Sequence, residues 1–379
     1  MGLFACAKAR QIAGCAGNQQ CLTRCNSMAK LAARRTLRKL WTRFKQGLIM
    51  KIAVIHDYAD ALRKTRAFPR LQGHEVMIYN DPYLDPARVV EQVDGCDALL
   101  LTQQRVNITH DILRQLPALK FISQTGRNVS HLDVNACTEL GILVSAGGHE
   151  GDNPYTVTGE LAWALILASL RHLPYEVEQL KQGHWHSTIG TRLHGRTLGI
   201  YAFGRIGSGV ARVGRAFGMK VLCWGRESSL ARARAEGFEV AASREAFFES
   251  ADVLSLHIKS NDATRGIVTA ADLARMKPTA LLVNTSRAPI IEDGALVAAL
   301  HQGRPGFAAI DVFEDEPVIG ANHPLLNMKN ALCTPHLGYN EKSSYEHVYA
   351  GGVEQLLAYA AGQPVNMLNP EVLEQRKTV

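Results

Sequence analysis

The stretch Thr197-Leu198-Gly199-Ile200-Tyr201-Ala202-Phe203-Gly204-Arg205-Ile206-Gly207 decides the fold of this 379-residue chain. An apolar strand runs into a tight turn and then into a helix that should end near Phe217. The turn glycine lets the backbone approach a pyrophosphate, and the glycine three residues later lets the helix pack closely on the strand. Phosphates would then lie on the unpaired N–H groups of the first helical turn. The stretch predicts a dinucleotide site formed by Gly204, Arg205, Ile206 and Gly207.

One position departs from the glycine pattern of such turns, because Ala202 stands where the first glycine is usual. A left-handed alanine costs ~1–2 kcal/mol. Two alternatives follow: the turn is not left-handed at Ala202, or the protein tolerates this strain.

Strands and helices alternate on both sides of this unit. Strands are expected at Lys51–His56, Glu75–Tyr79, Ala98–Thr102, Phe121–Gln124, and at 197–201, 220–224, 252–257, 280–284, 306–311 and 331–334. Helices are expected at Pro86–Val93, Ile108–Gln115, Tyr155–Leu170 and 341–361. This alternation predicts an α/β fold with two doubly wound parallel-sheet domains, the second a Rossmann dinucleotide-binding domain inserted in the first.

A loop rich in glycine and proline, Gly147 to Pro154, marks the expected crossing between the domains. We expect the substrate domain to span 50–152 and 340–379, and the Rossmann domain to span 153–339. Residues 1–49 contain ten Lys or Arg residues and no Asp or Glu. They are expected to form a disordered basic extension; a transit peptide, a nucleic-acid-binding arm and an upstream start codon all remain open.

The composition excludes several classes of protein. Hydrophobic residues make up 46% and charged residues 20% of the chain, as in globular proteins. The longest apolar run, Leu161 to Leu170, falls short of the ~18 residues of a membrane span. From Met50 onward the chain contains 32 basic and 35 acidic residues. This balance is slightly acidic, so neither a membrane nor a nucleic-acid partner is expected. The eight cysteines form no C-x-x-C pair, so we expect no metal site and a reducing, cytoplasmic location.

Three further motifs follow predicted strands, at the sheet edge where open α/β sheets bind ligands. They are Val283-Asn284-Thr285-Ser286-Arg287-Ala288, Asp311-Val312-Phe313-Glu314-Asp315-Glu316-Pro317 and Thr334-Pro335-His336-Leu337-Gly338. Singly, such residues are commonly surface ion pairs, solvated acids or turn caps. Together they form a complementary set. Arg287 can pair with a carboxylate and polarise a carbonyl, His336 can act as general acid or base, and Glu316 can fix the tautomer of the histidine.

These motifs resemble those of the D-isomer-specific 2-hydroxyacid dehydrogenase family, over about Lys51 to Leu373. The resemblance implies transfer of a hydride between a nicotinamide cofactor and C2 of a small D-2-hydroxy or 2-oxo acid. It makes Arg287, Glu316 and His336 the catalytic residues and places Thr285, Asp311 and Gly338 along the cofactor. It also implies that Arg127, Asn128 and Val129, with Arg287, bind the substrate. Small residues are usual in the family at positions 127 and 128, so Arg127 either reads an extra anionic group or is merely solvated.

The expected strand at 220–224 ends in Gly225-Arg226-Glu227. NAD-preferring members have an Asp at the glycine position to bind the adenine ribose, whereas Arg226 could bind a 2′-phosphate. We expect NAD(P)H as cofactor with NADPH favoured, although Glu227 could turn inward and replace the Asp. A homodimer is expected. A second function remains open, a dinucleotide-sensing binding protein of the co-repressor type on the same fold.

Overall fold

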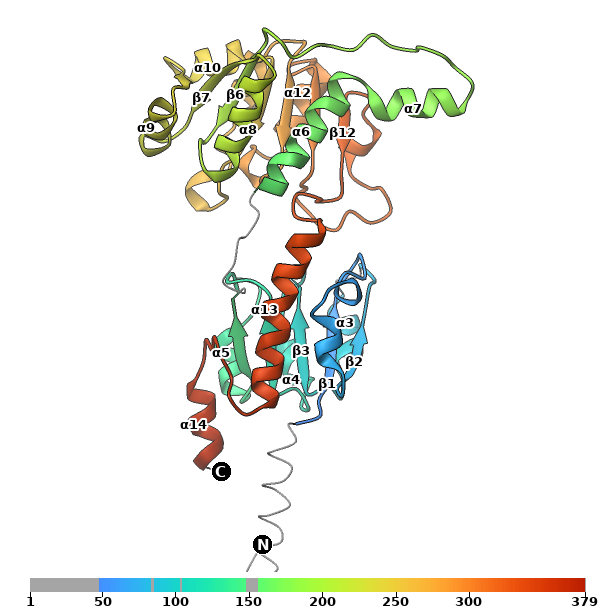
Figure 1. Cartoon of the computed structure of the whole chain (residues 1–379), viewed down its shortest axis with the longest axis vertical. Coiled ribbons are helices and arrows are strands. Elements are labelled where there is room, and N and C mark those ends of the chain that lie inside the picture. The colour runs from blue at the N-terminus through green and yellow to red at the C-terminus, as the bar shows by residue number, and fades with distance from the viewer. Residues whose placement is uncertain (1–47, 83–84, 103, 148–155, 379) are drawn as a thin grey trace, which may run out of the picture.

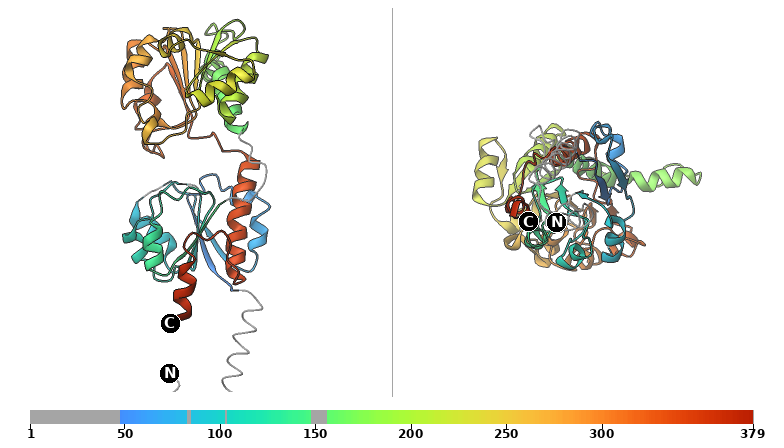
Figure 2. Two further views of the ribbon diagram at one scale, coloured as in Figure 1. Left: turned by 90° about the vertical axis from the view of Figure 1, so that its left-hand side faces the viewer. Right: turned by 90° about the horizontal axis from the view of Figure 1, so that it is seen from below.

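The computed structural model describes residues 48–82, 85–102, 104–147 and 156–378. Two α/β domains lie end to end along the long axis of the molecule (Figures 1 and 2). The first domain contains a five-stranded sheet and the second a seven-stranded sheet, and every strand pairing within the two sheets is parallel. The predicted fold class, two parallel-sheet α/β domains with a Rossmann-type second domain, is confirmed.

The sheet of the first domain has the order β2-β1-β3-β4-β5. Its strands are β1 Lys51–Ile55, β2 Glu75–Ile78, β3 Ala98–Leu101, β4 Phe121–Gln124 and β5 Leu143–Ala146. Its helices are α3 Pro86–Val93, α4 His110–Arg114, α5 Val134–Glu139, α13 Lys342–Ala360 and α14 Glu371–Thr378, with 3-10 turns η1 Leu62–Lys64 and η2 Phe68–Leu71. One face packs on α3, α4 and α5, and the other on α13, where Tyr349, Val353 and Leu356 are fully buried.

The sheet of the second domain has the order β12-β11-β10-β9-β6-β7-β8. Its strands are β6 Thr197–Tyr201, β7 Lys220–Trp224, β8 Glu239–Val240, β9 Val253–Leu256, β10 Leu281–Asn284, β11 Phe307–Ile310 and β12 Ala331–Cys333. The chain moves outward from β6 to β8 and then returns to β9 beside β6. This reversal of direction creates a crevice at the carboxyl ends of β6 and β9, the place where such sheets bind dinucleotides.

Helices cover both faces of the second sheet. They are α6 Thr156–Leu170, α8 Arg205–Ala216, α9 Glu227–Ala235, α10 Arg244–Ser250, α11 Ala270–Arg275 and α12 Ala295–Gln302, with 3-10 turns η3 Asp262–Thr264, η4 Ala288–Ile290 and η5 Pro324–Asn327. Helix α7, Leu173–Lys181, instead projects away from the domain (Figures 1 and 2). At the start of α6, the Thr158 hydroxyl donates to the Gly338 carbonyl at 2.7 Å, which ties α6 to the segment that leads into α13.

Two strands of the structure are absent from the predicted strands. The strand β5 was not expected, because its four residues lie between turn residues and offer no clear alternation. The strand β8 has only two residues, too few for any periodic signal. The predicted extension 1–49 lies outside the described residues up to position 47, as does most of the predicted crossing loop.

The turn after β6 decides between the two alternatives for Ala202. Its φ is 75°, so the residue is left-handed and the strain is tolerated. The next glycine positions have distinct roles. A Cβ on Gly204 would meet no atom within 4 Å, so the space above it is open, whereas a Cβ on Gly207 would lie 2.4 Å from the Ala202 carbonyl oxygen. Gly207 is therefore required by the packing of α8 against the turn.

We expect Gly207→Ala to lower the free energy of unfolding by ~1–3 kcal/mol, because the new methyl group overlaps the Ala202 carbonyl oxygen. Gly209→Ala, two residues along the same helix, is the matched control, since a Cβ there meets nothing within 4 Å. The control should be stabilising by ~0.5–1 kcal/mol, as alanine is the better helix former. Urea unfolding of the two variants and the parent measures both effects. Equal stabilities for the two variants would contradict this account of Gly207.

Candidate active site

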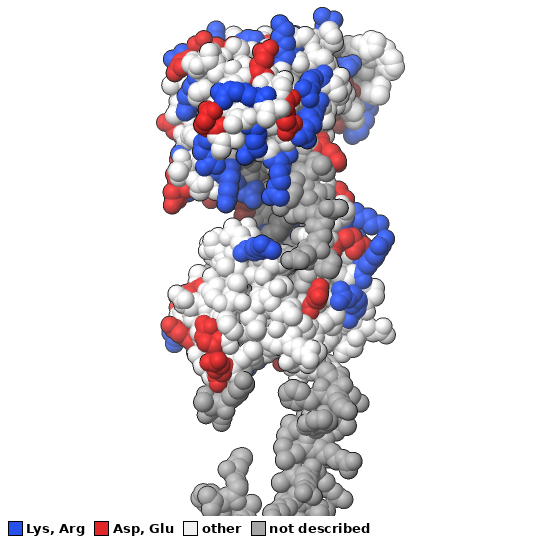
Figure 3. Space-filling model, turned by 60° about the vertical axis from the view of Figure 1, so that its left-hand side comes forward, with Lys and Arg blue, Asp and Glu red and all other residues white. Residues whose placement is uncertain are grey.

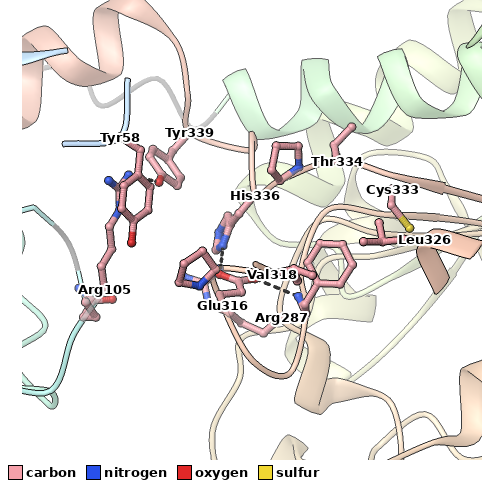
Figure 4. A pocket seen from close by; sticks show the side chains of 14 residues that line it. Tyr58, Arg105, Arg287, Glu316, Val318, Leu326, Cys333, Thr334, His336 and Tyr339 are labelled. Atoms are coloured by element: carbon pink, nitrogen blue, oxygen red, sulfur yellow. Dashed lines mark hydrogen bonds and ion pairs between the residues drawn. The ribbon is translucent and has the colours of Figure 1, made fainter. Parts of the chain in front are cut away.

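A pocket of about 400 Å³ lies where the two domains face each other. Its walls contain Tyr58, Gln104 and Arg105 from the first domain, and Arg287, Phe313, Glu316, Pro317, Val318, Leu326, Cys333, Thr334, Pro335, His336 and Tyr339 from the second domain and the segment that leads to α13. Figure 4 shows His336, Glu316 and Arg287 close together on one side of this pocket. The structure thus brings together the three residues that the motifs singled out.

His336 and Glu316 form a hydrogen-bonded pair. The Nδ1 atom of His336 lies 2.5 Å from Oε2 of Glu316, and the other carboxylate oxygen accepts the Phe313 N–H at 2.9 Å. Burial alone would raise the pKa of Glu316, but the hydrogen bond from His336 and the nearby charges of His336 and Arg287 lower that pKa below its usual value. A carboxylate only accepts, so Nδ1 carries a proton and Nε2 is the nitrogen left for a substrate.

The loop that carries His336 has a strained backbone. His336 has a φ of 52°, in the left-handed region that costs a non-glycine residue ~1–3 kcal/mol. Asp311, which is fully buried at the end of β11, holds this loop. Its carboxylate accepts the Thr334 hydroxyl at 2.5 Å and the N–H groups of Leu337 at 2.7 Å and Gly338 at 2.9 Å. Burial raises the pKa of Asp311 despite these three bonds. All three contacts fix the position of His336.

Arg287 follows β10 and caps the short turn η4. Its side chain is exposed, and its Nη1 atom donates to the Ser286 carbonyl at 2.7 Å. No Asp or Glu of the described residues forms an ion pair with it. The guanidinium therefore keeps most of its donors for an anionic ligand next to His336.

The crevice at β6 and β10 offers polar groups without partners. Gly204 caps α8 with open space above it, so a phosphate can approach the first turn of this helix. The Oγ1 atom of Thr285 is buried and has no hydrogen-bond partner in the described part of the chain. Gly338 is buried, and its carbonyl oxygen accepts from Thr158. An open glycine cap and an orphaned buried hydroxyl fit a bound dinucleotide.

The adenosine end of this crevice lies beyond β7. Gly225 has a φ of 151°, and a Cβ there would lie 3.4 Å from both Ala202 Cα and Ser229 Oγ. Arg226 caps α9 and is exposed, with no partner among the described residues. Glu227 is engaged by Arg234, whose Nη1 lies 2.6 Å from Oε1. Lys and Arg side chains gather on this side of the second domain, toward the first (Figure 3). Glu227 is thus paired with an arginine of its own helix, whereas Arg226 has no such partner among the described residues.

Comparisons with known proteins agree with this geometry. Residues 163–338 match the family model described as D-isomer specific 2-hydroxyacid dehydrogenase, NAD binding domain. A glyoxylate reductase of Aeropyrum pernix is 36% identical over 78% of this chain and 90% of its own length. The chain belongs to the D-isomer-specific 2-hydroxyacid dehydrogenase family. The predicted family and the predicted class of reaction, NAD-linked oxidoreduction of hydroxy and oxo acids, are confirmed.

Two further relatives of this dehydrogenase carry a different substrate in their names. A D-3-phosphoglycerate dehydrogenase of Synechocystis is 35% identical over 77% of the chain, which spans about half, 53%, of that protein. The crystal structure of a phosphoglycerate oxidoreductase from Vibrio cholerae is 45% identical, with a TM-score of 0.78 over 83% of this chain and all of that one.

The predicted substrate loop of the dehydrogenase does not line the pocket. Arg127 and Asn128 are exposed, and Val129 packs against the core of the first domain. Asn128 is linked to the pocket only indirectly, because its carbonyl oxygen accepts the Gln104 amide at 3.3 Å. Arg127, Asn128 and Val129 are thus not among the described residues that line this pocket, and their role in substrate binding stays a prediction.

Sequence reasoning missed Tyr58, Arg105 and Tyr339, which form the opposite wall of the pocket (Figure 4). Tyr58 and Arg105 come shortly after β1 and β3, so the rule that led to the other motifs, polar residues at the carboxyl ends of parallel strands, also applies to them. Tyr339 follows His336 in the sequence, and their ring centroids are 5.4 Å apart.

Two further findings concern the described residues only. They contain no group of three or more His, Cys, Asp or Glu side chains that could hold a metal ion. None of their helices combines the length and the apolar character that a membrane span requires.

Proposed function

We propose that this dehydrogenase reduces small 2-oxo acids to D-2-hydroxy acids, with His336 as general acid, Glu316 as its orienting partner and Arg287 as the carboxylate-binding group. The observation that carries this proposal is the His336–Glu316 pair at 2.5 Å beside an Arg287 that has no acidic partner in the described chain, in one pocket between the domains. A 2-oxo acid presents a carboxylate beside a ketone, and the pocket offers a cation and a proton donor side by side.

Each residue has a separate task in the reaction. Arg287 binds the C1 carboxylate through its planar fork and polarises the neighbouring ketone. His336 donates the Nε2 proton to the ketone oxygen during reduction and removes it from the hydroxyl during oxidation. Glu316 holds Nδ1 and stabilises the imidazolium. A bound nicotinamide supplies or accepts the hydride at C2. The two domains exclude water from the pocket when substrate is present.

The direct test is the absorbance change of NADH and NADPH in the presence of a panel of 2-oxo acids that includes glyoxylate, pyruvate and hydroxypyruvate. We expect consumption of the reduced cofactor that depends on the oxo acid. The competing function, a dinucleotide-sensing binding protein of the co-repressor type, predicts dinucleotide binding with no turnover of any oxo acid. Binding without turnover would therefore overturn the proposal in favour of that alternative.

For the cofactor we propose a preference for NADPH. Arg226 is exposed and without a protein partner, the usual Asp position is Gly225, and Glu227 is held by Arg234. Gly204, the first turn of α8 and Thr285 would hold the phosphates and the nicotinamide half, and Arg226 would bind the 2′-phosphate. For the substrate we propose a small 2-oxo or 2-hydroxy acid, as the names of the relatives suggest, which include glyoxylate reductases and phosphoglycerate dehydrogenases.

We also propose a homodimer that forms through the segment around α7. No side chain of α7 is buried, and six large apolar side chains of this segment are exposed: Leu173, Tyr175, Val177, Leu180, Trp185 and Ile189. Phe307, also exposed, contacts His172 at the base of α7 and extends the apolar surface. Exposed apolar surface of this extent marks a protein interface. A second copy of the chain offers the same surface in return, as a two-fold interface requires.

The double variant Val177→Glu/Leu180→Glu should dissociate this dimer, because two charges would be buried at the interface without partners. Light scattering coupled to size exclusion should then give the single-chain mass of 41.5 kDa instead of twice that value. Val365→Glu, an equally simple change at an exposed apolar residue of the first domain, should leave the dimer intact. A parent that is already monomeric at micromolar concentration would contradict the proposal.

For the location we propose the cytoplasm, without a nucleic-acid partner. Cys96, Cys137, Cys223 and Cys333 are free, and burial raises the pKa of each thiol to about 11 or 12, so they serve as apolar packing groups. The slightly acidic charge balance from Met50 onward gives no general attraction to nucleic acid.

A further inference from the structure

Side chains of α9 contact the turn from Ala202 to Gly204 that follows β6, the phosphate turn. Because β6 and β7 are parallel neighbours, this turn lies beside the start of α9, which follows β7. We propose that Ser229 and Arg232 of α9 are positioning residues for the dinucleotide. They hold the backbone of Phe203 and so keep the phosphate turn in the shape that receives the pyrophosphate. This inference concerns cofactor binding and does not depend on which oxo acid is reduced.

Both backbone polar groups of Phe203 are bound by α9. The Phe203 N–H donates to the Oγ atom of Ser229 at 2.6 Å, and this serine is buried. The Phe203 carbonyl oxygen accepts two hydrogen bonds from Arg232, at 3.3 Å from Nε and 3.0 Å from Nη2. The Phe203 ring is buried too, with its centroid 5.3 Å from that of Phe238. The middle residue of the phosphate turn is therefore fixed through its backbone and through its side chain.

The phosphate turn needs this support because its first residue is strained. Ala202 has a φ of 75°, in a region that alanine rarely adopts. Strain of this kind persists only where the surrounding structure imposes the conformation. The Ala202 N–H donates to the carbonyl of Trp224, the last residue of β7, at 2.8 Å. This bond and the bonds to Phe203 all come from β7 and α9, so this unit imposes the left-handed turn.

Loss of this support would weaken dinucleotide binding without removing a contact to the dinucleotide. Without the bonds to Phe203, Ala202 would leave the left-handed region, and Gly204 at the N-terminus of α8 would move with it. The apparent Kd rises as the binding-competent conformation becomes less populated. The pyrophosphate is common to NADH and NADPH, so the affinity for both should fall by the same factor.

A direct contact to the cofactor is the competing role for Arg232. Its side chain is exposed and has further N–H donors that Phe203 does not use. It also belongs to the helix that Arg226 caps, at the adenosine end of the crevice. A contact from Arg232 to the 2′-phosphate would affect NADPH alone. Support of the phosphate turn affects NADPH and NADH alike, so the two roles can be separated.

The experiment measures Kd for NADH and NADPH by calorimetry in the parent and three variants. Arg232→Met should raise Kd for both dinucleotides by ~5- to 30-fold and Ser229→Ala by ~3- to 10-fold, because each variant removes hydrogen bonds to Phe203. Arg212→Met is the matched loss of an exposed arginine that bonds to Glu236 instead, and it should change neither Kd. With saturating cofactor, kcat should stay within about twofold of the parent in all variants, since only binding is affected.

Ala202→Gly provides a rescue, because glycine adopts a positive φ without strain. In this background the phosphate turn no longer needs to be imposed. The double variant Ala202→Gly/Arg232→Met should therefore bind both dinucleotides within about threefold of Ala202→Gly alone. Ser229→Ala replaces only a hydroxyl, and it carries the same test in the Ala202→Gly background if Arg232→Met does not fold.

Hydrogen exchange of the cofactor-free protein gives a readout that involves no ligand. The amides of Phe203 and Gly204 should exchange faster in Arg232→Met than in the parent and in Arg212→Met, with the rest of the second domain unchanged. Four results would overturn the proposal: an unchanged Kd in Arg232→Met and Ser229→Ala, a loss confined to NADPH, a loss of the same size in the Ala202→Gly background, or faster exchange throughout the domain.

Discussion

Replacement of His336 by alanine is expected to lower kcat for 2-oxo acid reduction by ~10²–10⁴-fold, with dinucleotide affinity unchanged. The variant removes the proton donor from the pocket, while the Arg287 guanidinium remains to bind the carboxylate. The cofactor groups around Gly204 and Thr285 belong to other strands and are not touched by the change. Stopped-flow or steady-state kinetics with saturating cofactor, together with a fluorescence titration of NADPH, measures the two quantities separately.

The chain contains a matched control for this experiment. His323 forms a similar pair with Glu314, at 2.9 Å between Nε2 and Oε2, in the same domain but outside the pocket between the domains. His323→Ala removes an imidazole and its carboxylate contact and should leave kcat within about twofold of the parent. Comparable kcat for His336→Ala and the parent would refute the assignment of the general acid.

The second large effect concerns the choice of dinucleotide. Arg226→Ala should weaken NADPH binding by ~1.5–3 kcal/mol, or about 10- to 150-fold in Kd, and leave NADH binding nearly unchanged. The reason is that the 2′-phosphate, present only in NADPH, would lose a charge-assisted contact to a guanidinium without another partner in the described chain. Calorimetry with both dinucleotides gives Kd directly, and kcat/KM with each should follow the same order.

Arg212→Ala is the control for the loss of one positive charge near the crevice. Arg212 lies on α8 and pairs with Glu236 through two hydrogen bonds of 3.0 Å, so its charge is already neutralised. This variant should bind both dinucleotides as the parent does. A parent that binds NADH more tightly, or an Arg226→Ala variant that loses both cofactors equally, would show that Arg226 does not recognise the 2′-phosphate.

Much of the second domain follows from local sequence patterns. The turn after β6, the strand ends that carry Arg287, Glu316 and His336, and the stop of α8 at Gly218 depend on residues that are close in the chain. Parallel strands have their carboxyl ends at the same edge of the sheet. Residues that follow successive strands therefore lie near one another, whatever the details of the loops between them. This is why the His336–Glu316 pair could be predicted from the motifs at these strand ends and from their resemblance to a known family.

The first-domain wall of the pocket could not be predicted in the same way. Whether Arg105 or Arg127 faces His336 depends on how the two domains are oriented, which no local pattern encodes. Both residues follow strands of the same sheet, β3 and β4, and both are arginines in polar loops. Only the packing of Arg105 on Tyr58 and Tyr339 distinguishes them, and Tyr339 belongs to a distant part of the chain. The pocket of the structure is lined by Arg105, and the interpretation of Arg127 as a reader of an extra anion stays a prediction.

The bond between the Thr158 hydroxyl and the Gly338 carbonyl, 2.7 Å long, has a consequence for motion. It joins the beginning of α6 to the segment that leads to α13. The Gly338 N–H of the same segment donates a hydrogen bond to the Asp311 carboxylate at 2.9 Å. The outgoing and returning chains are thus fastened to the second domain at one place. Two connecting segments that were attached at separate places would restrict rotation between the domains. Two segments attached at one place allow rotation about that place. We therefore expect any rotation of the second domain relative to the first to turn about this place, so that it displaces His336, two residues before Gly338, only slightly.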